Sequence, residues 1–305
     1  MPAWHTEEIR QRNWGWAGPH SAQEPWGFRP DEWGAPPARQ PWNADSMDSV
    51  KSIFDGYDVG IRYADDAVGT VMNKLDELGV LDETAILLSS DHGEAFGELG
   101  VYADHQAADE ATCHIPAILR WPGIDARTYS GLHYQLDLAA TVVDLADITL
   151  PVGWWNGESV KDALLAGDDA GRDHLVLSQG AWSCQRGVRW GDHLYLRTFH
   201  DGYHPHWGDE MLFDVAADPH EVHDLADDRP DLVGDGAARL TTWTEEQLEI
   251  ALGDLGDPME IVLAEGGPYH VRRHLPAYLE RLRDTGRSGW ADVLVDRFPA
   301  DAASS

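Results

Sequence analysis

The apolar positions between residues 46 and 78 recur at steps of three and four, which is the period of an amphipathic helix. The residues on this apolar stripe are Ile53, Tyr57, Ile61, Ala64, Val68, Met72, Leu75 and Leu78. Gly79 follows the last of them, and glycine is the residue type that commonly ends a helix. The pattern therefore predicts one long helix over 46–78 with a single apolar face.

A short apolar run, Thr84–Ser90, comes next and is bounded by acidic residues on both sides. Such a run predicts a buried central strand in a sheet that is covered on both faces. Ile115–Arg120 predicts a second strand. Residues 133–146 then predict an amphipathic helix on which Asp137 has a structural role, capping or orienting its neighbours. Its inward residues are expected to be Leu136, Ala140, Val143 and Leu145.

Short strands separated by turn residues begin at Asp173. The apolar runs predict strands over 174–178, 187–190, 193–198 and 210–215. Gly191-Asp192 has the length and the residue types of a two-residue hairpin turn. Residues 229–298 predict helices around a loop rich in Gly and Pro at 253–268, followed by a frayed tail.

The first 45 residues show no hydrophobic period and are rich in Trp, Pro and Gly. Exposed tryptophans in such number would be a liability, so this irregular segment is expected to lie over other parts of the protein. They are Trp14, Trp16, Trp26, Trp33 and Trp42. The chain is thus divided into an irregular segment (1–45), an α/β core (46–172), a small antiparallel sheet (173–228) and a helical extension with a tail (229–305).

Asp91, His92 and Gly93 directly follow the predicted strand 84–90. In open α/β sheets, ligands bind beyond the carboxyl ends of the strands. An adjacent carboxylate and imidazole offer an oxygen and a nitrogen to one point, which is half of a divalent-metal site. Alternatively, Asp91 caps a helix and His92 lies on the surface. Taken alone, the pair leaves both interpretations open.

A second cluster, His200, His204 and His206, also has metal-ligating residue types. Asp201-Gly202 and Pro205 mark this segment as a loop between strands. Loop histidines are usually solvated, and short matches of this kind often occur without a metal. We therefore expect solvated histidines here rather than a metal site.

The acidic composition narrows the choice of partners. The chain has 54 acidic and 22 basic residues among 305, a formal net charge of −32, and its only lysines are Lys51, Lys74 and Lys161. This charge argues against nucleic acid and anionic membranes as partners, because like charges repel. The acids are spread along a chain of ordinary aromatic content, which argues against disorder. Carboxylates that replace lysine over a normal core suggest a halophilic host, where salt screens the repulsion.

Cys113 and Cys184 are the two cysteines, and neither lies in a C-x-x-C motif, so no disulfide framework is expected. No apolar run is long enough to span a bilayer. The first residues lack the basic and apolar regions of a signal peptide. Together these features predict a cytoplasmic protein.

The residues around Asp91 belong to an ordered series, which runs from Ser90-Asp91-His92-Gly93 through His105 and Asp109-Glu110 to Ile115-Pro116-Ala117-Ile118 and Pro122-Gly123. In order and spacing this series resembles the sulfatases of the alkaline-phosphatase superfamily. Leu212-Phe213-Asp214-Val215 and Asp218-Pro219-His220-Glu221 extend the resemblance, which covers about residues 55–226. It implies an α/β fold: a partial alkaline-phosphatase-like sandwich, a mixed sheet flanked by helices, with a small C-terminal antiparallel sheet.

The resemblance implies metal-assisted hydrolysis of a sulfuric ester, with a sulfate-ester or related anionic small molecule or glycan as substrate. Asp91 and His92 match metal ligands of the family, whose metal is usually Ca²⁺, with Mn²⁺ or Mg²⁺ as alternatives. His105 matches a catalytic Lys or His near the leaving oxygen, and His200 matches a residue at the pocket edge. Asp104 stands where many members have Lys. His92 replaces the more common Asn, as in relatives that cleave phosphonates and phosphodiesters, which keeps that alternative open.

The resemblance also implies residues that this sequence does not contain. Family members carry, well before the metal strand, a cysteine that is oxidised to formylglycine in a C-x-P-S-R or C-x-A-R context. Cys113 and Cys184 lie after that strand and lack this context, so no nucleophile is assigned. The first pair of metal-binding acids is not found either. We therefore expect the C-terminal part of a sulfatase, inactive alone, whose exposed sheet edges need the N-terminal half or a partner chain. A non-catalytic fragment is the remaining alternative.

Overall fold

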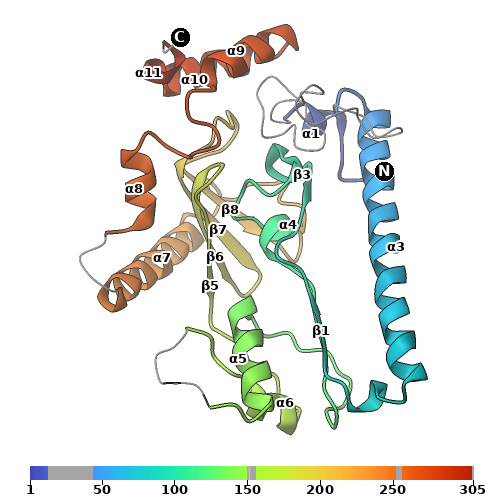
Figure 1. Cartoon of the computed structure of the whole chain (residues 1–305). Helices are drawn as coiled ribbons and strands as arrows, with labels where there is room; N and C mark the ends of the chain where they lie inside the picture. The colour runs from blue at the N-terminus through green and yellow to red at the C-terminus, as the bar shows by residue number, and fades with distance from the viewer. Residues whose placement is uncertain (13–43, 150, 152–155, 252–255, 304–305) are drawn as a thin grey trace.

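The computed structural model of this protein describes residues 1–12, 44–149, 151, 156–251 and 256–303. Its strands form three antiparallel sheets with helices around them (Figure 1). The Trp-rich residues 13–43 of the predicted irregular segment lie outside the described residues. The helices are α1 (Glu7–Gln11), α3 (Met47–Glu77), α4 (Glu110–Cys113), α5 (Gln135–Leu145), α6 (Lys161–Ala166), α7 (Pro230–Ile250), α8 (Pro258–Ala264), α9 (Leu275–Asp284), α10 (Ser288–Arg297) and α11 (Pro299–Ala302).

The long helix α3 confirms the helix predicted over 46–78. The Ser46 hydroxyl caps its start and accepts a hydrogen bond from the Ser49 amide at 3.1 Å. Gly79 follows its end with a φ of 71°, a left-handed backbone that glycine adopts without strain. Only the first turns of the helix are buried, at Val50 and Ile53.

Much of α3 beyond these turns is exposed. On the predicted stripe Tyr57 and Ile61 are exposed, whereas Val68, Met72 and Leu75 are half-buried. Away from the stripe, Val59 is 69% exposed and Tyr63 is 79% exposed. Figure 1 shows α3 standing along one side of the molecule, with its first turns near α1. The sequence period therefore forms the helix, but the described residues cover its apolar surface only in part.

Strand β1 (Ile86–Ser89) pairs antiparallel with β4 (Ala117–Arg120). Both strands confirm the sequence analysis, but the prediction of a buried central strand is wrong within the described residues. Leu87 is 42% exposed and Ile118 is 61% exposed. A strand is buried on both faces only when further strands and helices flank it, and β4 is the only described strand that pairs with β1. This pair therefore leaves its edges and part of its apolar surface uncovered.

A second strand pair lies in the loop between β1 and β4. β2 (Ala95–Phe96) pairs with β3 (Tyr102–Asp104), and a 3₁₀ turn, Glu98–Gly100, lies between them. Phe96 and Tyr102 pack in one core cluster with the buried start of α3 and with residues of α9 and α10. This packing holds the segment after β1 against the main body of the protein.

The predicted small antiparallel sheet is confirmed. Its strands β5 (Leu175–Gln179), β6 (Cys184–Trp190), β7 (His193–His200) and β8 (Glu210–Asp214) pair in sequence order. Trp190 pairs with His193 across Gly191-Asp192, which confirms the two-residue turn. One face of the sheet packs against Ala107 and Ala108 of the loop after β3, and the other face packs against α7. The sheet is therefore covered on both sides.

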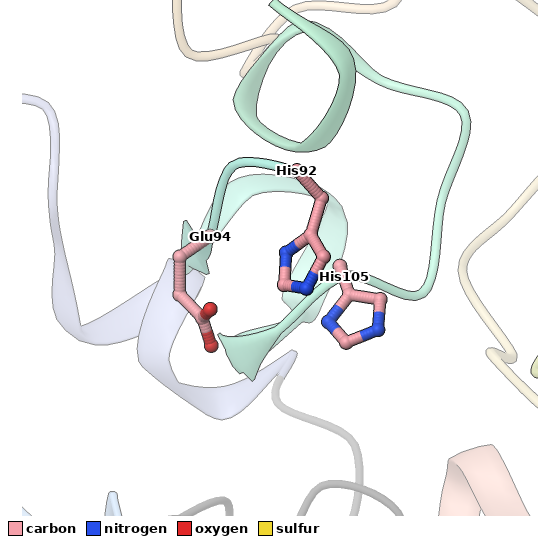
Figure 2. A group of neighbouring side chains, drawn as sticks. All are labelled: His92, Glu94 and His105. Carbon is pink, nitrogen blue, oxygen red and sulfur yellow. The ribbon is translucent and has the colours of Figure 1, made fainter. Parts of the chain in front are cut away.

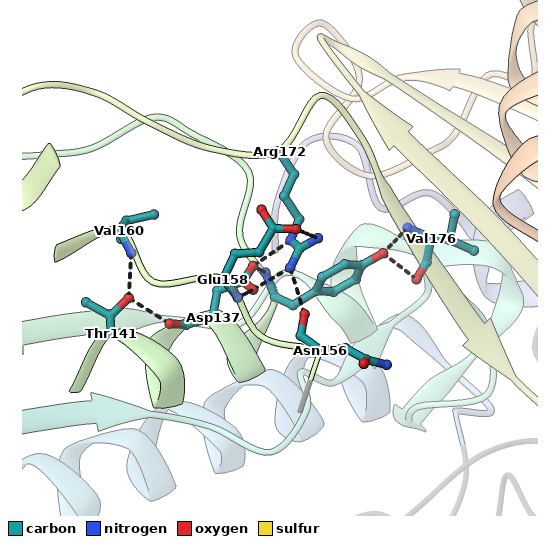
Figure 3. A network of polar contacts seen from close by, with 8 residues as sticks. Asp137, Thr141, Asn156, Glu158, Val160, Arg172 and Val176 are labelled. Carbon is teal, nitrogen blue, oxygen red and sulfur yellow. Dashed lines mark hydrogen bonds and ion pairs between the residues drawn. The ribbon is translucent and has the colours of Figure 1, made fainter. Parts of the chain in front are cut away.

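Asp137 on α5 has the structural role that its sequence context predicts. Its carboxylate accepts a hydrogen bond from the Tyr134 amide at 2.8 Å and pairs with Arg172, whose Nη2 lies 2.6 Å from Asp137 Oδ1 (Figure 3). The same carboxylate accepts from the Glu158 amide. This network ties α5 to the segment that leads into β5. The expected inward position of Leu136 is wrong, because Asp137 turns inward to this network and leaves Leu136 exposed.

Two segments predicted to be irregular, 1–45 and 253–268, each contain a short helix that begins at a capping side chain. The first 45 residues are not irregular throughout, because α1 forms where the Thr6 hydroxyl accepts from the Ile9 amide. The loop predicted at 253–268 contains α8, which begins at Pro258 after the Asp257 carboxylate caps the Met259 amide. None of the described helices is both long enough and apolar enough to cross a membrane.

Candidate functional site

Among the described residues, three neighbouring side chains have the types and spacing of metal ligands: His92, Glu94 and His105. Each offers one ligand atom, and these atoms all lie within 4.8 Å of one another. Figure 2 shows that His92 and Glu94 come from the segment after β1 and that His105 comes from the end of β3. The β2–β3 pairing brings these two segments together.

The tautomer of His92 is set by the carbonyl group of the next residue, Gly93. Its Nδ1 lies 2.8 Å from the Gly93 carbonyl oxygen, so Nδ1 donates a proton there and the lone pair remains on Nε2. Ser90 Oγ donates to the His92 carbonyl at 2.7 Å, and Asp91 Oδ1 accepts from the His92 amide at 3.0 Å. The turn after β1 therefore holds His92 in the form that binds a metal through Nε2.

Gly93 is required by the close packing of this turn. Its amide donates to the Thr112 carbonyl oxygen of α4 at 2.7 Å. A Cβ atom at residue 93 would lie only 2.0 Å from the Ala111 carbonyl oxygen. Only glycine lets the two backbones approach this closely, so the position of His92 is fixed against α4.

His105 is oriented by a buried carboxylate. Asp104 Oδ1 lies 3.3 Å from His105 Nδ1 and accepts a hydrogen bond from the His105 amide at 2.7 Å. A carboxylate behind an imidazole fixes the ring and leaves its Nε2 for a ligand or a reacting group. Burial lowers the pKa of His105, while Asp104 raises it and His92 lowers it further. The lowered pKa favours the neutral imidazole at neutral pH.

Glu94 completes the group beside the two imidazoles, whose ring centroids stack 3.9 Å apart. Burial raises the pKa of Glu94 to about 7, with Asp104 also raising it and His92 lowering it. A bound cation would favour the ionised carboxylate. The sequence analysis does not identify Glu94. The available signal is its spacing of two from His92, which places both side chains on one side of an extended segment.

Asp91 is exposed and lies outside this group of three. Its Oδ2 lies 3.8 Å from His92 Nε2, a spacing that one ion can bridge, because metal–ligand bonds are about 2.0–2.6 Å long. The backbone amide of His92 holds the pKa of Asp91 below its usual range. The carboxylate is therefore ionised at neutral pH, and its role as a ligand stays a prediction.

The expectation of solvated histidines at 204 and 206 is wrong. His204 stacks on Trp207 with ring centroids 4.0 Å apart, and its Nε2 lies 3.0 Å from Gln106 Oε1. His206 is also covered, and its Nε2 lies 2.8 Å from the Leu99 carbonyl oxygen. Burial lowers the pKa of both rings. His204 is buried and His206 is half-buried, so neither is a solvated loop histidine.

His200 is not a member of the His92–Glu94–His105 group. Its ring stacks on Phe298 with centroids 4.9 Å apart and lies under Gly267. Burial lowers its pKa to about 4. Its assignment to the pocket edge stays a prediction.

Neither cysteine has the properties of an activated thiol. Burial raises the pKa of Cys113, with further raising by Asp109, Glu221 and Glu110. Burial also raises the pKa of Cys184 to about 11. Both thiols are protonated at neutral pH, and a protonated thiol is a weak nucleophile.

The sulfatase family model matches residues 12–148 of this chain. The matched region includes α3, β1, β4 and all three residues of the metal-ligating group. It therefore confirms the resemblance to sulfatases that the sequence analysis drew from the series around Asp91.

Curated relatives agree with this match. The chain is 26% identical over 215 residues to an ulvan-active sulfatase of Formosa agariphila. The matched region covers 67% of this chain and 39% of the relative. It is 27% identical over 243 residues to a choline-sulfatase of Rhizobium meliloti, and this match covers 75% of this chain and 45% of the relative. The chain thus spans less than half the length of these two relatives.

Solved structures show the same fold. A 2-O GAG sulfatase is 20% identical with a TM-score of 0.58, covering 85% of this chain and 55% of that chain. A protein solved with its substrate D-glucosamine-2-N,6-O-disulfate is 22% identical with a TM-score of 0.56, covering 66% of this chain and 40% of that chain. The predicted α/β fold class with a small antiparallel sheet is therefore confirmed.

Proposed function

We propose that this sulfatase-related chain contributes part of the active site of a metal-assisted hydrolase of sulfate esters. The observation that carries the proposal is the group formed by His92 and Glu94 after β1 and His105 after β3, all within the family match. One imidazole nitrogen beside carboxylate oxygens suits Mn²⁺ better than Ca²⁺ or Mg²⁺, which prefer oxygen ligands alone. Of the metals that the resemblance implies, we therefore propose Mn²⁺.

We assign His92 and Glu94 as metal ligands, with Asp91 as a third after its exposed carboxylate turns toward His92 Nε2. A divalent ion held there would neutralise charge on the transferred sulfuryl group. We assign His105 as the catalytic imidazole, which presents Nε2 to the reacting ester and exchanges a proton there. Asp104 is its positioning residue because it holds Nδ1. The nucleophile is not assigned to any residue of this chain.

Metal analysis tests this assignment without requiring turnover. The 305-residue protein is loaded with Mn²⁺, desalted and measured for bound manganese. His92→Ala and Asp91→Ala are expected to bind manganese at least about tenfold more weakly, because each removes a ligand. His223→Ala removes an exposed histidine from the turn after β8 and is the matched control. Unchanged manganese in His92→Ala would contradict the site.

A phosphonate or phosphodiester hydrolase is the second candidate, favoured by His92 in a position where the family more often has Asn. Turnover of an aryl sulfate and of a phosphonate monoester, compared in the same preparation, separates the two activities. Absence of turnover of either ester in an assembled enzyme with bound metal would favour a non-catalytic role.

We further propose that the exposed surface of α3, β1 and β4 packs against additional polypeptide of a sulfatase core, supplied by an N-terminal half or a partner chain. Val59, Tyr63, Leu87 and Ile118 are exposed there. Such apolar surface commonly marks a protein interface. The relatives' greater length supports the same proposal. Their additional chain would complete the sheet that β1 and β4 begin.

A further inference from the structure

The segment between α8 and α9 lies outside the family match and reaches the candidate site. The His270 amide donates a hydrogen bond to the Ala181 carbonyl oxygen at 3.1 Å, in the turn where β5 leads into β6 (Figure 1). The His270 imidazole stacks on Trp182 with ring centroids 4.0 Å apart and 18° between the planes. These two contacts fix the His270 ring on that turn.

The same turn is tied to His105. Gln179 Nε2 donates to the His105 carbonyl oxygen at 2.7 Å. Gln179 Oε1 accepts from the amides of Gly180 and Ala181, both at 3.0 Å. The hydrogen bonds therefore connect His105, the β5–β6 turn and His270 in one continuous series.

The pKa of His270 also reflects the nearness of the candidate site. Burial lowers the pKa of His270, Asp104 raises it, and His105 lowers it further. Both residues that act on His270 belong to the candidate site. His270 thus lies at the edge of the site although it is far from His105 in sequence.

The segment around His270 has a fixed shape. Gly266 and Gly267 have φ values of 98° and 90°, and Arg272 Nε donates back to the Gly267 carbonyl oxygen at 2.8 Å. Val271 is buried in the core cluster that includes Trp182. Tyr269 is exposed and lies edge-on to His270, with ring centroids 5.2 Å apart. The loop is therefore held in one conformation, in which the rings of Tyr269 and His270 are exposed to solvent.

The segments around His270 lack the acidic residues that are frequent in the rest of the chain. Residues 174–191 and 266–279, which meet at His270, contain no acidic residue, although the chain has 54 acids among 305 residues. The second stretch instead carries His270, Arg272, Arg273 and His274. Asp104 nearby is buried behind His105, and Glu265 pairs with Arg272 at 3.3 Å. Arg273 is exposed. These two stretches therefore add little repulsion to an approaching anion, and the nearby acids Asp91 and Glu94 are those that a bound cation would neutralise.

We propose that residues 269–273 form an anion-binding wall of the substrate pocket, which receives a second sulfate or carboxylate group of a sulfated glycan. The assignment rests on the proposed function, since the first sulfate is the one at the metal. Tyr269 and His270 offer ring faces to a sugar, and the Arg273 guanidinium matches the geometry of an oxyanion. The preferred substrate class is therefore a polyanionic glycan rather than a small monosulfate ester.

Calorimetric binding of two sugars tests the wall without turnover. D-glucosamine-2-N,6-O-disulfate is the doubly charged probe, and glucosamine 6-O-sulfate is the singly charged one. Arg273→Gln is expected to weaken disulfate binding about tenfold and monosulfate binding about twofold, because one charge-assisted contact is lost. Arg62→Gln is the control of equal charge change, since Arg62 is an exposed residue on α3. His270→Ala is expected to weaken the binding of both sugars, because it removes a ring face that either sugar would contact.

If Arg273→Gln and Arg62→Gln changed disulfate binding equally, the proposed anion-binding wall would be refuted. The absence of disulfate binding by the unmodified protein would refute it as well. Circular dichroism confirms that each variant is folded. The manganese measurement on His92 is independent of these results. Loss of the metal site with retained disulfate preference would refute the proposed function but not the wall. An intact metal site without disulfate preference would refute the wall alone.

Discussion

The β5–β8 sheet and the α3–β1–β4 region both have apolar faces, but only the sheet covers its apolar residues within the described chain. Leu194 and Leu212 of the sheet have no exposed surface, whereas Val59, Tyr63 and Ile118 of the other region are largely exposed. Figure 1 shows the sheet in the middle of the molecule and α3 at its side. Periodicity thus determines which residues share a face, and burial depends on what packs against that face.

The candidate site lies where these two regions meet. His92 and Glu94 follow β1, which belongs to the uncovered region. The segment after His105 is bound to the covered sheet, because the Ala108 amide donates to Gln185 Oε1 at 2.9 Å and Arg189 Nε lies 2.7 Å from Glu110 Oε1. The sheet therefore supplies the rigid support of the site.

The largest expected difference between the regions is in core truncations. Leu212→Ala is expected to lower the free energy of unfolding by about 3–4 kcal/mol, because it leaves a cavity between the sheet and α7. Ile118→Ala on the exposed pair is expected to change it by less than about 1 kcal/mol. Urea unfolding of both variants measures the difference. Equal losses would show that β4 is as well covered as the sheet.

The next effect concerns the network that joins α5 to the sheet. Arg172→Met is expected to cost about 2–3 kcal/mol, because it leaves the buried Asp137 carboxylate without its cation. The matched control is Arg62→Met, which breaks an exposed pair with Asp66 and is expected to cost less than about 0.5 kcal/mol. Urea midpoints at pH 7 give both values. A similar cost for the two variants would contradict the structural role of Asp137.

A smaller, pH-dependent effect is expected where α4 meets the chain after β8. Burial raises the pKa of Asp109 to about 6 from 3.8, so the folded state holds its proton more tightly than the unfolded state. This carboxyl group therefore stabilises the fold below about pH 4, and its contribution falls as the pH rises to about 6.

Asp109→Asn removes this proton dependence and keeps an N-cap for the Thr112 amide. Relative to the wild type, the variant is expected to gain up to about 3 kcal/mol of stability between pH 4 and pH 8. Urea unfolding at the two pH values measures the gain. A constant difference between variant and wild type would mean that Asp109 is ionised throughout.

The smallest effect on stability is expected on the exposed face of α3. Val59→Lys and Tyr63→Lys are each expected to change the free energy of unfolding by less than about 0.5 kcal/mol, because neither side chain is packed. Sedimentation should show less self-association in both variants, since each removes exposed apolar surface. A loss of more than 1 kcal/mol on thermal or urea unfolding would mean that this face is buried in the protein as it exists in solution.

The sequence predicts those parts of the fold that depend on local signals. Ser46 and Gly79 bound α3 because a cap and a left-handed glycine act within a few residues. Gly191-Asp192 likewise fixes the β6–β7 turn. Asp257 and Pro258 carry the same kind of signal for α8, but the surrounding Gly and Pro residues concealed it.

The parts that the sequence does not predict depend on long-range packing. The exposure of Leu87 and the burial of His204 follow from which elements lie beside them, and neither can be read from spacing. Glu94 joins the site only because β2 and β3 bring His105 back to it. His270 reaches the site from a segment more than 150 residues away in the chain, beyond the reach of any local motif.

The central claim is that the end of β1 forms part of a divalent-metal site, and Mn²⁺ titration followed by NMR of the histidine side chains tests it most directly. Bound Mn²⁺ broadens the resonances of nearby nuclei. The account predicts that His92 and His105 broaden first, that His223 stays sharp, and that the broadening disappears in His92→Ala. Broadening that spreads evenly over the exposed acidic surface, or that leaves His92 and His105 sharp, would contradict the claim.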